Sequence, residues 1–426
     1  MAGRARGYDD PKDQIVVATD HLDLVGRELG SGAIVSTVPN SRLGLTLVTL
    51  ADPAAAGRML EQRRIAEFPD APAPEVGEDP DRVLAELRLL SERRYCGWVP
   101  TLGKNRTLDG VEFKPYTHGF DKPTPARRPE PVTGRAEVHG EKVRVGLFDT
   151  RIAAHEQLEG SYLAGPDAMV TPPAQGRPRL WWEGHATFIA GIIRRHAPSA
   201  VLDVRTALLR EPDGPQERWT MPLWTFAERL AEYQNAGVEV LNLSVGVATG
   251  DGRPPLVLQR AIAQLTPSMV VVAAAGNHGM GDLSDEARTK AGLPARGAAL
   301  FPAALDNVVA VGALDGTRPG RVDAVFTPRG AHETETAPWI DVFAPGVETV
   351  STYLGDAHRE SVLVRDAGGH EELVDFEGWA SWSGTSFAAG EITGEIAALL
   401  AQGLPAPEAV AEVRRRNPRP EAGPGA

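Results

Sequence analysis

The sequence predicts an α/β protein with a doubly wound, mostly parallel sheet and a smaller N-terminal α+β module. Two observations support this fold class. From about residue 141 onward, short and almost wholly apolar runs alternate with helical patterns, as in parallel strands that are covered on both faces. Before that point, strand and helix patterns follow one another in a shorter unit that ends at a proline-rich stretch, 121–135.

The smaller module is expected to comprise residues 1–135, with the linker to the rest of the chain at about 121–135. β-rich runs separated by turn residues predict its strands, which are 14–19, 33–38 and 43–50. Amphipathic patterns predict its helices, which are 22–29, 53–68 and 81–94. Together these elements indicate a small α+β unit.

The main domain is expected at 141–417, followed by a disordered tail at 418–426. Its candidate strands are nearly all apolar and lie at 143–148, 201–207, 238–244, 269–275 and 308–311. Helical patterns separate several of them, at 185–195, 222–236, 254–265 and 386–402. A domain of this length can bury most of its apolar surface without a disulfide.

Composition excludes several classes of function. The formal net charge of −13 argues against binding to nucleic acid or to an anionic membrane, because both require a basic face. The single cysteine, Cys96, allows no intramolecular disulfide, which fits a reducing compartment. The N-terminus has no apolar core of signal-peptide length, and the most apolar run, 269–276, is too short to span a bilayer. We therefore expect a cytoplasmic protein.

Two polar residues stand where an acid and a base would be placed. Asp149 directly follows a buried strand, at the sheet edge where α/β proteins place their sites. His185 begins a helical pattern whose apolar face covers 188–193, and its near-neutral pKa suits proton transfer. Each has an ordinary structural alternative, since Asp149 could cap a turn and His185 could be a buried structural histidine.

Two further segments offer a nucleophile and an oxyanion donor. Ser386 stands at the expected start of a helix, where the helix dipole favours negative charge. Asn277 follows an apolar strand and a run of small residues, so its side-chain N–H can face a developing oxyanion. The alternatives are a simple N-cap for Ser386 and a plain Gly-Asn turn for Asn277.

The order of these residues along the chain distinguishes between the known classes of serine hydrolase. It is Asp, His, Asn, Ser along the chain, whereas α/β-hydrolases have Ser, Asp, His and chymotrypsin has His, Asp, Ser. Ala388 also stands where a nucleophile elbow requires glycine. The order Asp, His, Ser is that of subtilisin.

Residues 141–417 resemble the peptidase S8, or subtilase, catalytic domain. The resemblance rests on Asp149-Thr150, on the run Gly184-His-Ala-Thr-Phe-Ile-Ala-Gly-Ile and on Gly384-Thr-Ser-Phe-Ala-Ala. It implies the subtilisin fold and hydrolysis of peptide bonds in protein or peptide substrates by the Asp149, His185 and Ser386 triad, with Asn277 in the oxyanion hole. It also implies that structural calcium is frequent, although the sequence identifies no calcium ligand and no required cofactor.

The chain departs from the family pattern at four positions. Arg151, Ala186, Phe188 and Gly390 replace the usual Gly, Gly, His and Pro. No departure removes a proton-transfer group, an oxyanion donor or the nucleophile, so activity is expected to survive. Arg151 could touch the substrate groove, stabilise Asp149 as a carboxylate or lie solvated on the surface. Gly390 can start or bend a helix.

The substrate is expected to lie extended in a cleft. The residues expected to bind it belong to two strand ends and are Leu243, Ser244, Val245, Gly246, Ala273, Ala274 and Gly276. The small residues among them indicate an open primary pocket. Polar stretches at about 281–299 and 356–378 look like surface insertions, where specificity can reside or which can be neutral.

Three alternatives remain open at this point. The N-terminal module resembles the propeptide of many subtilases and could regulate the enzyme, or it could bind a substrate or partner. The altered motifs could instead mark a catalytically impaired subtilase-fold scaffold that binds without hydrolysis. A third possibility is a different acyl transfer, such as peptide ligation, on the same fold.

Overall fold

The structure is a computed structural model of the chain. It describes residues 10–74, 79–110, 122–129, 142–165, 167–171, 178–207, 209–210, 219–250, 252–279, 284, 288, 294–330, 336–355, 360–365 and 370–420.

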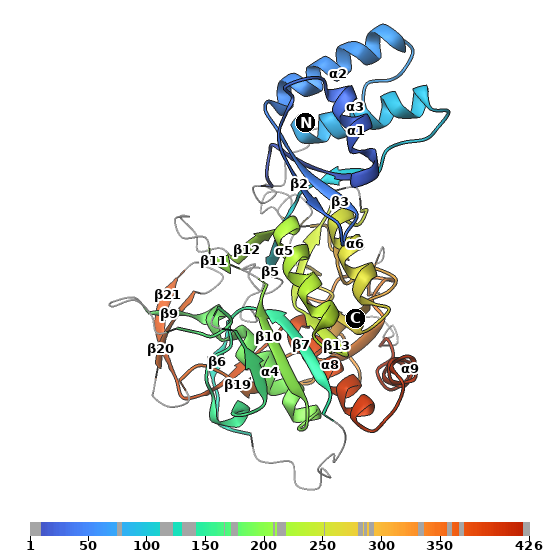
Figure 1. Cartoon of the computed structure of the whole chain (residues 1–426). Helices are drawn as coiled ribbons and strands as arrows, with labels where there is room; N and C mark the ends of the chain where they lie inside the picture. The colour runs from blue at the N-terminus through green and yellow to red at the C-terminus, as the bar shows by residue number, and fades with distance from the viewer. Residues whose placement is uncertain are drawn as a thin grey trace.

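The N-terminal module is an antiparallel sheet covered by helices on one face (Figure 1). Its sheet has the strand order β2-β3-β1-β4. The strands are β1 (Gln14–Ala18), β2 (Ile34–Asn40), β3 (Leu45–Leu50) and β4 (Leu102–Lys104), and the helices are α1 (Leu22–Leu29), α2 (Pro53–Glu67) and α3 (Asp79–Arg94). Side chains from both layers form one apolar core, which includes Ile15, Leu60 and Leu87. The elements expected from the sequence are therefore confirmed to within a few residues.

The large domain is built on a seven-stranded sheet in which every pair of neighbouring strands is parallel. Its strand order is β18-β17-β15-β13-β7-β10-β8. The strands are β7 (Arg144–Asp149), β8 (Tyr162–Ala164), β10 (Val201–Thr206), β13 (Val240–Leu243), β15 (Val270–Ala274), β17 (Val309–Leu314) and β18 (Val342–Pro345). The doubly wound α/β class is confirmed.

Helices cover both faces of this sheet, which explains why its strands are apolar throughout. The helices of the domain are α4 (His185–His196), α5 (Leu223–Leu230), α6 (Leu256–Leu265), α8 (Thr385–Ala401) and α9 (Ala406–Arg416). Leu241 and Val271 face α5 and α6 in one apolar core. Val240 and Val272, their immediate neighbours in sequence, face α8 in another.

Three smaller sheets surround this core. The first has the order β11-β12-β5-β14-β16 and joins strands from both parts of the chain. The strands of these sheets are β5 (Thr107–Gly110), β6 (Thr124–Pro125), β9 (Arg179–Leu180), β11 (Leu209–Arg210), β12 (Trp219–Pro222), β14 (Val245–Ala248), β16 (Leu300–Phe301), β19 (Thr349–Thr352), β20 (Glu360–Arg365), β21 (Glu371–Phe376) and β22 (Trp379–Trp382). The sequence patterns did not predict most of these short strands.

The segments that were expected to be irregular are partly ordered. Within the linker, β6 pairs with β22, and within the expected insertion at 356–378, β20 and β21 form an antiparallel hairpin. In the expected tail, Arg419 donates hydrogen bonds to the carbonyls of Thr336 and Ile340. Residues 421–426, 130–141 and most of the insertion at 281–299 lie outside the described residues.

Candidate active site

Asp149 and His185 form a buried hydrogen-bonded pair at the carboxyl edge of the large sheet. Asp149 is the last residue of β7 and is 1% exposed, and His185 is 2% exposed. His185 Nδ1 lies 2.7 Å from Asp149 Oδ1, which also accepts the Thr150 N–H at 2.6 Å. Because a carboxylate can only accept, Nδ1 carries the proton in this contact, and the basic lone pair of the imidazole is on Nε2.

The first turn of α4 is tied to the loop that follows β7. The Ala186 N–H donates to Thr150 Oγ1 at 3.1 Å, and Thr187 Oγ1 accepts the Ala153 N–H at 2.8 Å. These bonds pair a backbone N–H of the first helical turn and one of the loop, neither of which has a partner within the helix. They also hold His185 at a fixed position above the end of β7.

Gly184 permits the close approach of Tyr353 to the start of α4. A Cβ at Gly184 would lie only 2.2 Å from the Tyr353 ring, so no larger residue fits there. The Tyr353 hydroxyl donates to the Trp181 carbonyl. Burial raises the pKa of Tyr353 well above its usual value, so this hydroxyl remains a neutral donor.

Ser386 lies in the first turn of α8 and is fully buried. The ring of the next residue, Phe387, lies 5.7 Å from the His185 ring between centroids. Helices α4 and α8 pack against each other, since a Cβ at Gly390 would meet Ile189 and Ile192, and one at Gly394 would meet His196. The later residue of α8, Gly394, contacts the later residue of α4, so the two helices run parallel. Both therefore begin at the same end, where His185 and Ser386 lie.

Asn277 is linked to the start of α8 through its side-chain oxygen. Asn277 Oδ1 accepts the Thr385 N–H at 2.9 Å and the Thr385 hydroxyl at 3.0 Å. Thr385 Oγ1 in turn accepts the Gly276 N–H at 3.0 Å. Because the oxygen of the amide faces Thr385, its NH₂ group is directed away from Thr385. This orientation is the one an oxyanion donor needs.

The residues predicted to bind substrate fall into two groups. Leu243, Ala273 and Ala274 belong to central strands and are fully buried. Leu243 and Ala273 have strand partners on both sides, and Ala274 pairs with Val311. A strand that is paired on both sides offers no free edge to a substrate backbone, so the binding role of these three residues stays a prediction. Ser244, Val245, Gly246 and Gly276 follow the strands and stay candidates.

The edge of β14 already has a partner from the N-terminal part of the chain. Val245 and Gly246 pair antiparallel with Gly110 and Asp109 of β5. On its other side β5 pairs with β12, where Leu108 lies opposite Met221. Leu108 is fully buried in the same apolar cluster as α5 and β14. Strand β5 therefore occupies the place at which an extended substrate was expected.

Sequence reasoning missed the aromatic wall beside His185. The Trp382 ring lies edge-on to the imidazole at 5.5 Å between centroids, and Phe188 lies 4.5 Å from Phe387. Trp382 is 1% exposed, so this wall shields the imidazole from water. The signal available in the sequence was the position of Trp382, four residues before Ser386.

Arg151, one of the departures from the family pattern, donates a hydrogen bond to the Asp167 carbonyl at 3.0 Å.

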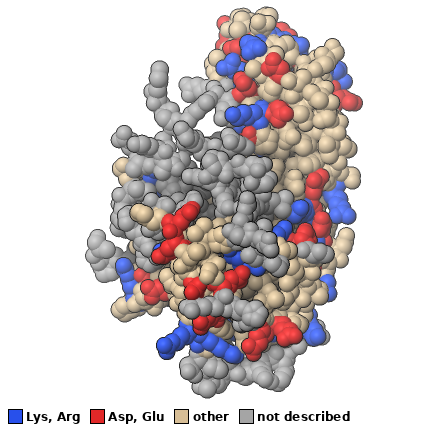
Figure 2. Space-filling view, turned by 90° about the vertical axis from the view of Figure 1, so that its left-hand side faces the viewer, with Lys and Arg blue, Asp and Glu red and all other residues tan. Residues whose placement is uncertain are grey.

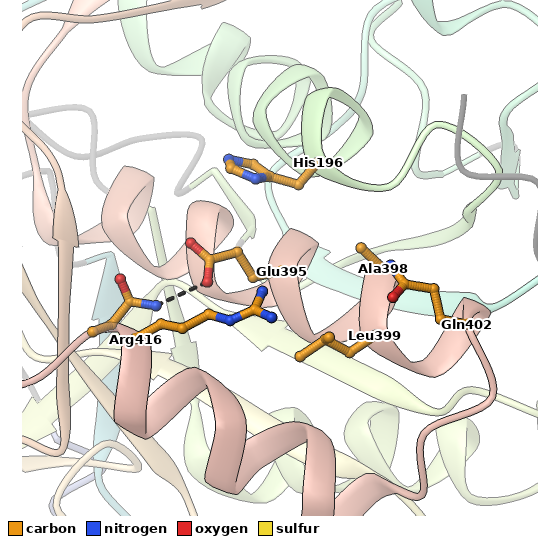
Figure 3. Close-up of a pocket in the computed structure, with 7 residues that line it drawn as sticks. His196, Glu395, Ala398, Leu399, Gln402 and Arg416 are labelled. Carbon is orange, nitrogen blue, oxygen red and sulfur yellow. Dashed lines mark hydrogen bonds between the residues drawn. The ribbon is translucent and has the colours of Figure 1, made fainter. Parts of the chain in front are cut away.

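A separate cavity of about 320 Å³ lies at the opposite end of α4 and α8. Figure 3 shows side chains from three helices around it, including His196, Glu395 and Arg416. Asn417 donates to Glu395 at 2.8 Å. Since α4 has 12 residues, His196 lies roughly 16 Å along the helix axis from His185. This cavity is therefore not part of the candidate active site.

The described residues assign no metal site. Among them, no group of three His, Cys, Asp or Glu side chains lies close enough together to hold an ion. Backbone carbonyls and Asn or Gln oxygens can also bind calcium, so structural calcium stays a prediction from the family resemblance, and no chemical step is derived through it. None of the described helices is long and apolar enough to cross a membrane.

Comparison with known proteins covers most of the large domain. The sequence model described as "Subtilase family" matches residues 140–416. M-protease of Shouchella clausii is 28% identical over 289 residues, which cover 65% of this chain and 58% of that protein. Subtilisin Savinase of Lederbergia lenta is 28% identical over 242 residues, which cover 54% of this chain and 72% of that protein. The chain thus spans little more than half the length of M-protease.

One solved structure covers nearly the whole chain. It is that of fervidolysin from Fervidobacterium pennivorans, described as a keratinolytic enzyme related to subtilisin. The TM-score is 0.55 at 17% identity, and the match covers 94% of this chain and 56% of that chain. The match therefore extends beyond residues 140–416 into the N-terminal module, and it supports the fold.

Proposed function

Because the chain belongs to the subtilase family, we propose that it is a serine endopeptidase that hydrolyses peptide bonds in proteins or peptides. The observation that carries the proposal is the buried Asp149–His185 hydrogen bond of 2.7 Å. It lies at the same end of the helix pair as Ser386, the second residue of α8. An acid, a base and a hydroxyl in this order are what acyl transfer by a serine nucleophile requires.

The proposed mechanism uses only residues of this chain. His185 Nε2 takes the proton of Ser386 Oγ as this oxygen attacks the scissile carbonyl, and Asp149 stabilises the resulting imidazolium. The Asn277 side-chain N–H and the Ser386 amide bind the oxyanion. His185 then returns the proton to the leaving amine, and water hydrolyses the acyl-enzyme in a second, equivalent cycle.

Surface charge supports recognition through the substrate backbone and through pockets. On the face seen in Figure 2, acidic and basic side chains lie interspersed over the described surface. A mixed surface of this kind, with a net charge of −13, does not favour nucleic acid or an anionic membrane. We propose a polypeptide substrate and, from the single cysteine, a cytoplasmic location.

A fluorophosphonate probe tests the proposed activity on the full-length protein. We expect covalent labelling of the wild type and complete loss of labelling in Ser386→Ala, because the probe reacts only with an activated serine. Ser383→Ala is the matched control, since Ser383 lies three residues earlier and its hydroxyl accepts the Glu348 N–H. Because the N-terminal module can cover the cleft, the labelling is repeated after residues 1 to about 135 are removed. The proposal is contradicted, and the scaffold alternative favoured, when both forms stay unlabelled.

We also propose that the N-terminal module inhibits the enzyme through β5. The support is the pairing of Asp109 and Gly110 with β14 and the full burial of Leu108. A substrate that needs the same edge has to displace β5 first.

The variant Leu108→Asp tests this regulation in the full-length chain. A charge at this buried position weakens the docking of β5, so the hydrolysis of a protein substrate such as casein should become faster. Val38→Asp is the control, because Val38 lies in the same module but is 45% exposed. If both variants hydrolyse casein at the wild-type rate, β5 does not inhibit.

A further inference from the structure

Leu300 lies between the two chain segments that follow β13 and β15. These strands are neighbours in the sheet, and the chain continues from them to Gly246 and Gly276. A Cβ added at Gly246 would lie 2.5 Å from Leu300 Cδ2, and one added at Gly276 would lie 2.9 Å from the same atom. One methyl group of Leu300 therefore contacts both segments and fills the gap between them.

This gap is where the proposed reaction places a substrate side chain. Gly276 directly precedes Asn277, the proposed oxyanion donor. The α-carbon of the residue whose carbonyl is attacked is bonded directly to that carbonyl carbon. When the carbonyl oxygen faces Asn277, this α-carbon lies close to Gly276, the residue that precedes Asn277. The space between Gly276 and Gly246, which Leu300 fills, therefore adjoins the substrate side chain in the proposed reaction.

Leu300 is held firmly in this position. It is 6% exposed and belongs to a core cluster with Val240, Val272 and Ala274. Its strand β16 pairs antiparallel with β14, with Leu300 opposite Ala248. Since its neighbours are packed strands, the side chain cannot move aside without disturbing the core.

His278 limits the same space next to Gly276. A Cβ at Gly276 would lie 2.8 Å from His278 Nδ1, and His278 Nε2 is 3.0 Å from the Ala298 carbonyl. Gly276 has a φ of 102°, a conformation that favours glycine. The absence of a side chain at Gly276 thus makes room for Leu300 and His278.

We propose that Leu300 is a specificity-determining residue that restricts the primary pocket to small side chains. On the proposed function, on which this inference rests, the enzyme cleaves after Gly, Ala or Ser and discriminates against Leu and Phe. The restriction is steric, so shortening Leu300 opens the pocket to larger side chains.

Diphenyl phosphonates of N-acetylated alanine and phenylalanine test the inference on the full-length protein. In each reagent the Ser386 oxygen forms a bond to phosphorus, phenoxide leaves, and the serine proton passes to His185. The reagents are single residues, so they do not require β5 to leave. A fluorophosphonate without such a side chain measures the reactivity of Ser386 itself, and labelling rates are read by intact mass.

The wild type is expected to react with the alanine reagent at least about tenfold faster than with the phenylalanine reagent. In Leu300→Ala, the phenylalanine reagent should gain about tenfold while the fluorophosphonate rate changes little. Leu300→Val, a milder change, should give a smaller gain in the same direction. Leu305→Ala is the matched control, because it removes the same atoms from a buried leucine of the same segment and should keep the wild-type ratio.

The outcomes separate the inference from the proposed function. A wild type that reacts with the fluorophosphonate, but equally fast with both phosphonates, overturns the inference and leaves the protease proposal standing. A wild type that reacts with none of the three reagents overturns both. If Leu300→Ala does not fold, the wild-type ratio and Leu300→Val decide, and an unchanged ratio in Leu300→Val overturns the inference.

Discussion

The two ends of the parallel helices α4 and α8 hold their polar groups in different ways. At one end, His185 is the first residue of α4 and forms a hydrogen bond with Asp149, and Ser386 lies in the first turn of α8. At the other end, Glu391 of α8 accepts hydrogen bonds from Arg195 and His196 of α4. One end thus holds a hydrogen-bonded acid and imidazole, and the other end holds an ion pair.

The ion pair at the far end keeps Glu391 charged although it is buried. Burial by itself raises the pKa of Glu391, but the hydrogen bond from His196 and the charges of His196 and Arg195 lower it further than burial raises it, so the net pKa is lowered. The comparison indicates that the ion pair joins α4 and α8 at their far end.

The largest expected effect comes from removing the charge at the far end. Glu391→Gln leaves His196 and Arg195 without their shared partner, and we expect a loss of about 3 kcal/mol in the free energy of unfolding. Denaturation in urea, monitored by circular dichroism, measures this loss. Fluorophosphonate labelling of the folded fraction should also become slower if the helices move apart at the cleft.

Glu395→Gln is the matched control, because Glu395 lies one turn away and accepts from Asn417. It should lower the free energy of unfolding by less than about 1 kcal/mol.

The pH dependence of the free energy of unfolding sharpens the test. Because the folded pKa of Glu391 is lowered below the usual 4.5, its contribution is complete above about pH 4.5 and is lost as the pH falls through the folded value. Glu391→Gln should lack this acid loss, and equal acid sensitivity in both proteins would contradict the assignment.

A smaller effect is expected where glycines bring the two helices together. A Cβ at Gly394 would lie 2.7 Å from His196 Cβ and 3.0 Å from the Ile193 carbonyl. Gly394→Ala should therefore lower the free energy of unfolding by roughly 1 to 3 kcal/mol. Thermal unfolding of the variant and the wild type measures the difference.

Gly390→Ala provides the graded comparison on the same helix. There a Cβ would lie 3.3 Å from the methyl groups of Ile189 and Ile192, which can yield slightly. The gain in helix propensity of about 1 kcal/mol offsets this contact, so the variant should be close to neutral. If Gly390→Ala proved the more damaging of the two, the packing described for α4 and α8 would be incorrect.

Sequence patterns predicted those features that depend on local neighbours. The strands β7, β13 and β15 are mostly apolar. The polar residues Asp149 and Asn277 stand at or shortly after the ends of β7 and β15. A helix start at His185 was visible because Ile189, Ile192 and Ile193 define one apolar face. In the structure, Asp149 and Asn277 follow parallel strands and therefore lie at the same edge of the sheet.

Features that depend on distant partners could not be predicted in this way. Strand β5 has only four residues, and its partners β12 and β14 lie more than 100 residues further along the chain. Leu300 belongs to the two-residue strand β16, and the role proposed for it depends on its contacts with Gly246 and Gly276. The role of Glu391 likewise depends on His196, which lies on another helix.

The insertion of β5 between β12 and β14 also bears on how the large domain would behave alone. Without β5, both strands would expose unpaired backbone N–H and C=O groups along a slot the width of one strand. A loop from a second molecule that enters such a slot would pair with both strands, which would lead to aggregation. A preparation that lacks residues 107–110 would therefore need an added extended peptide to remain stable in storage.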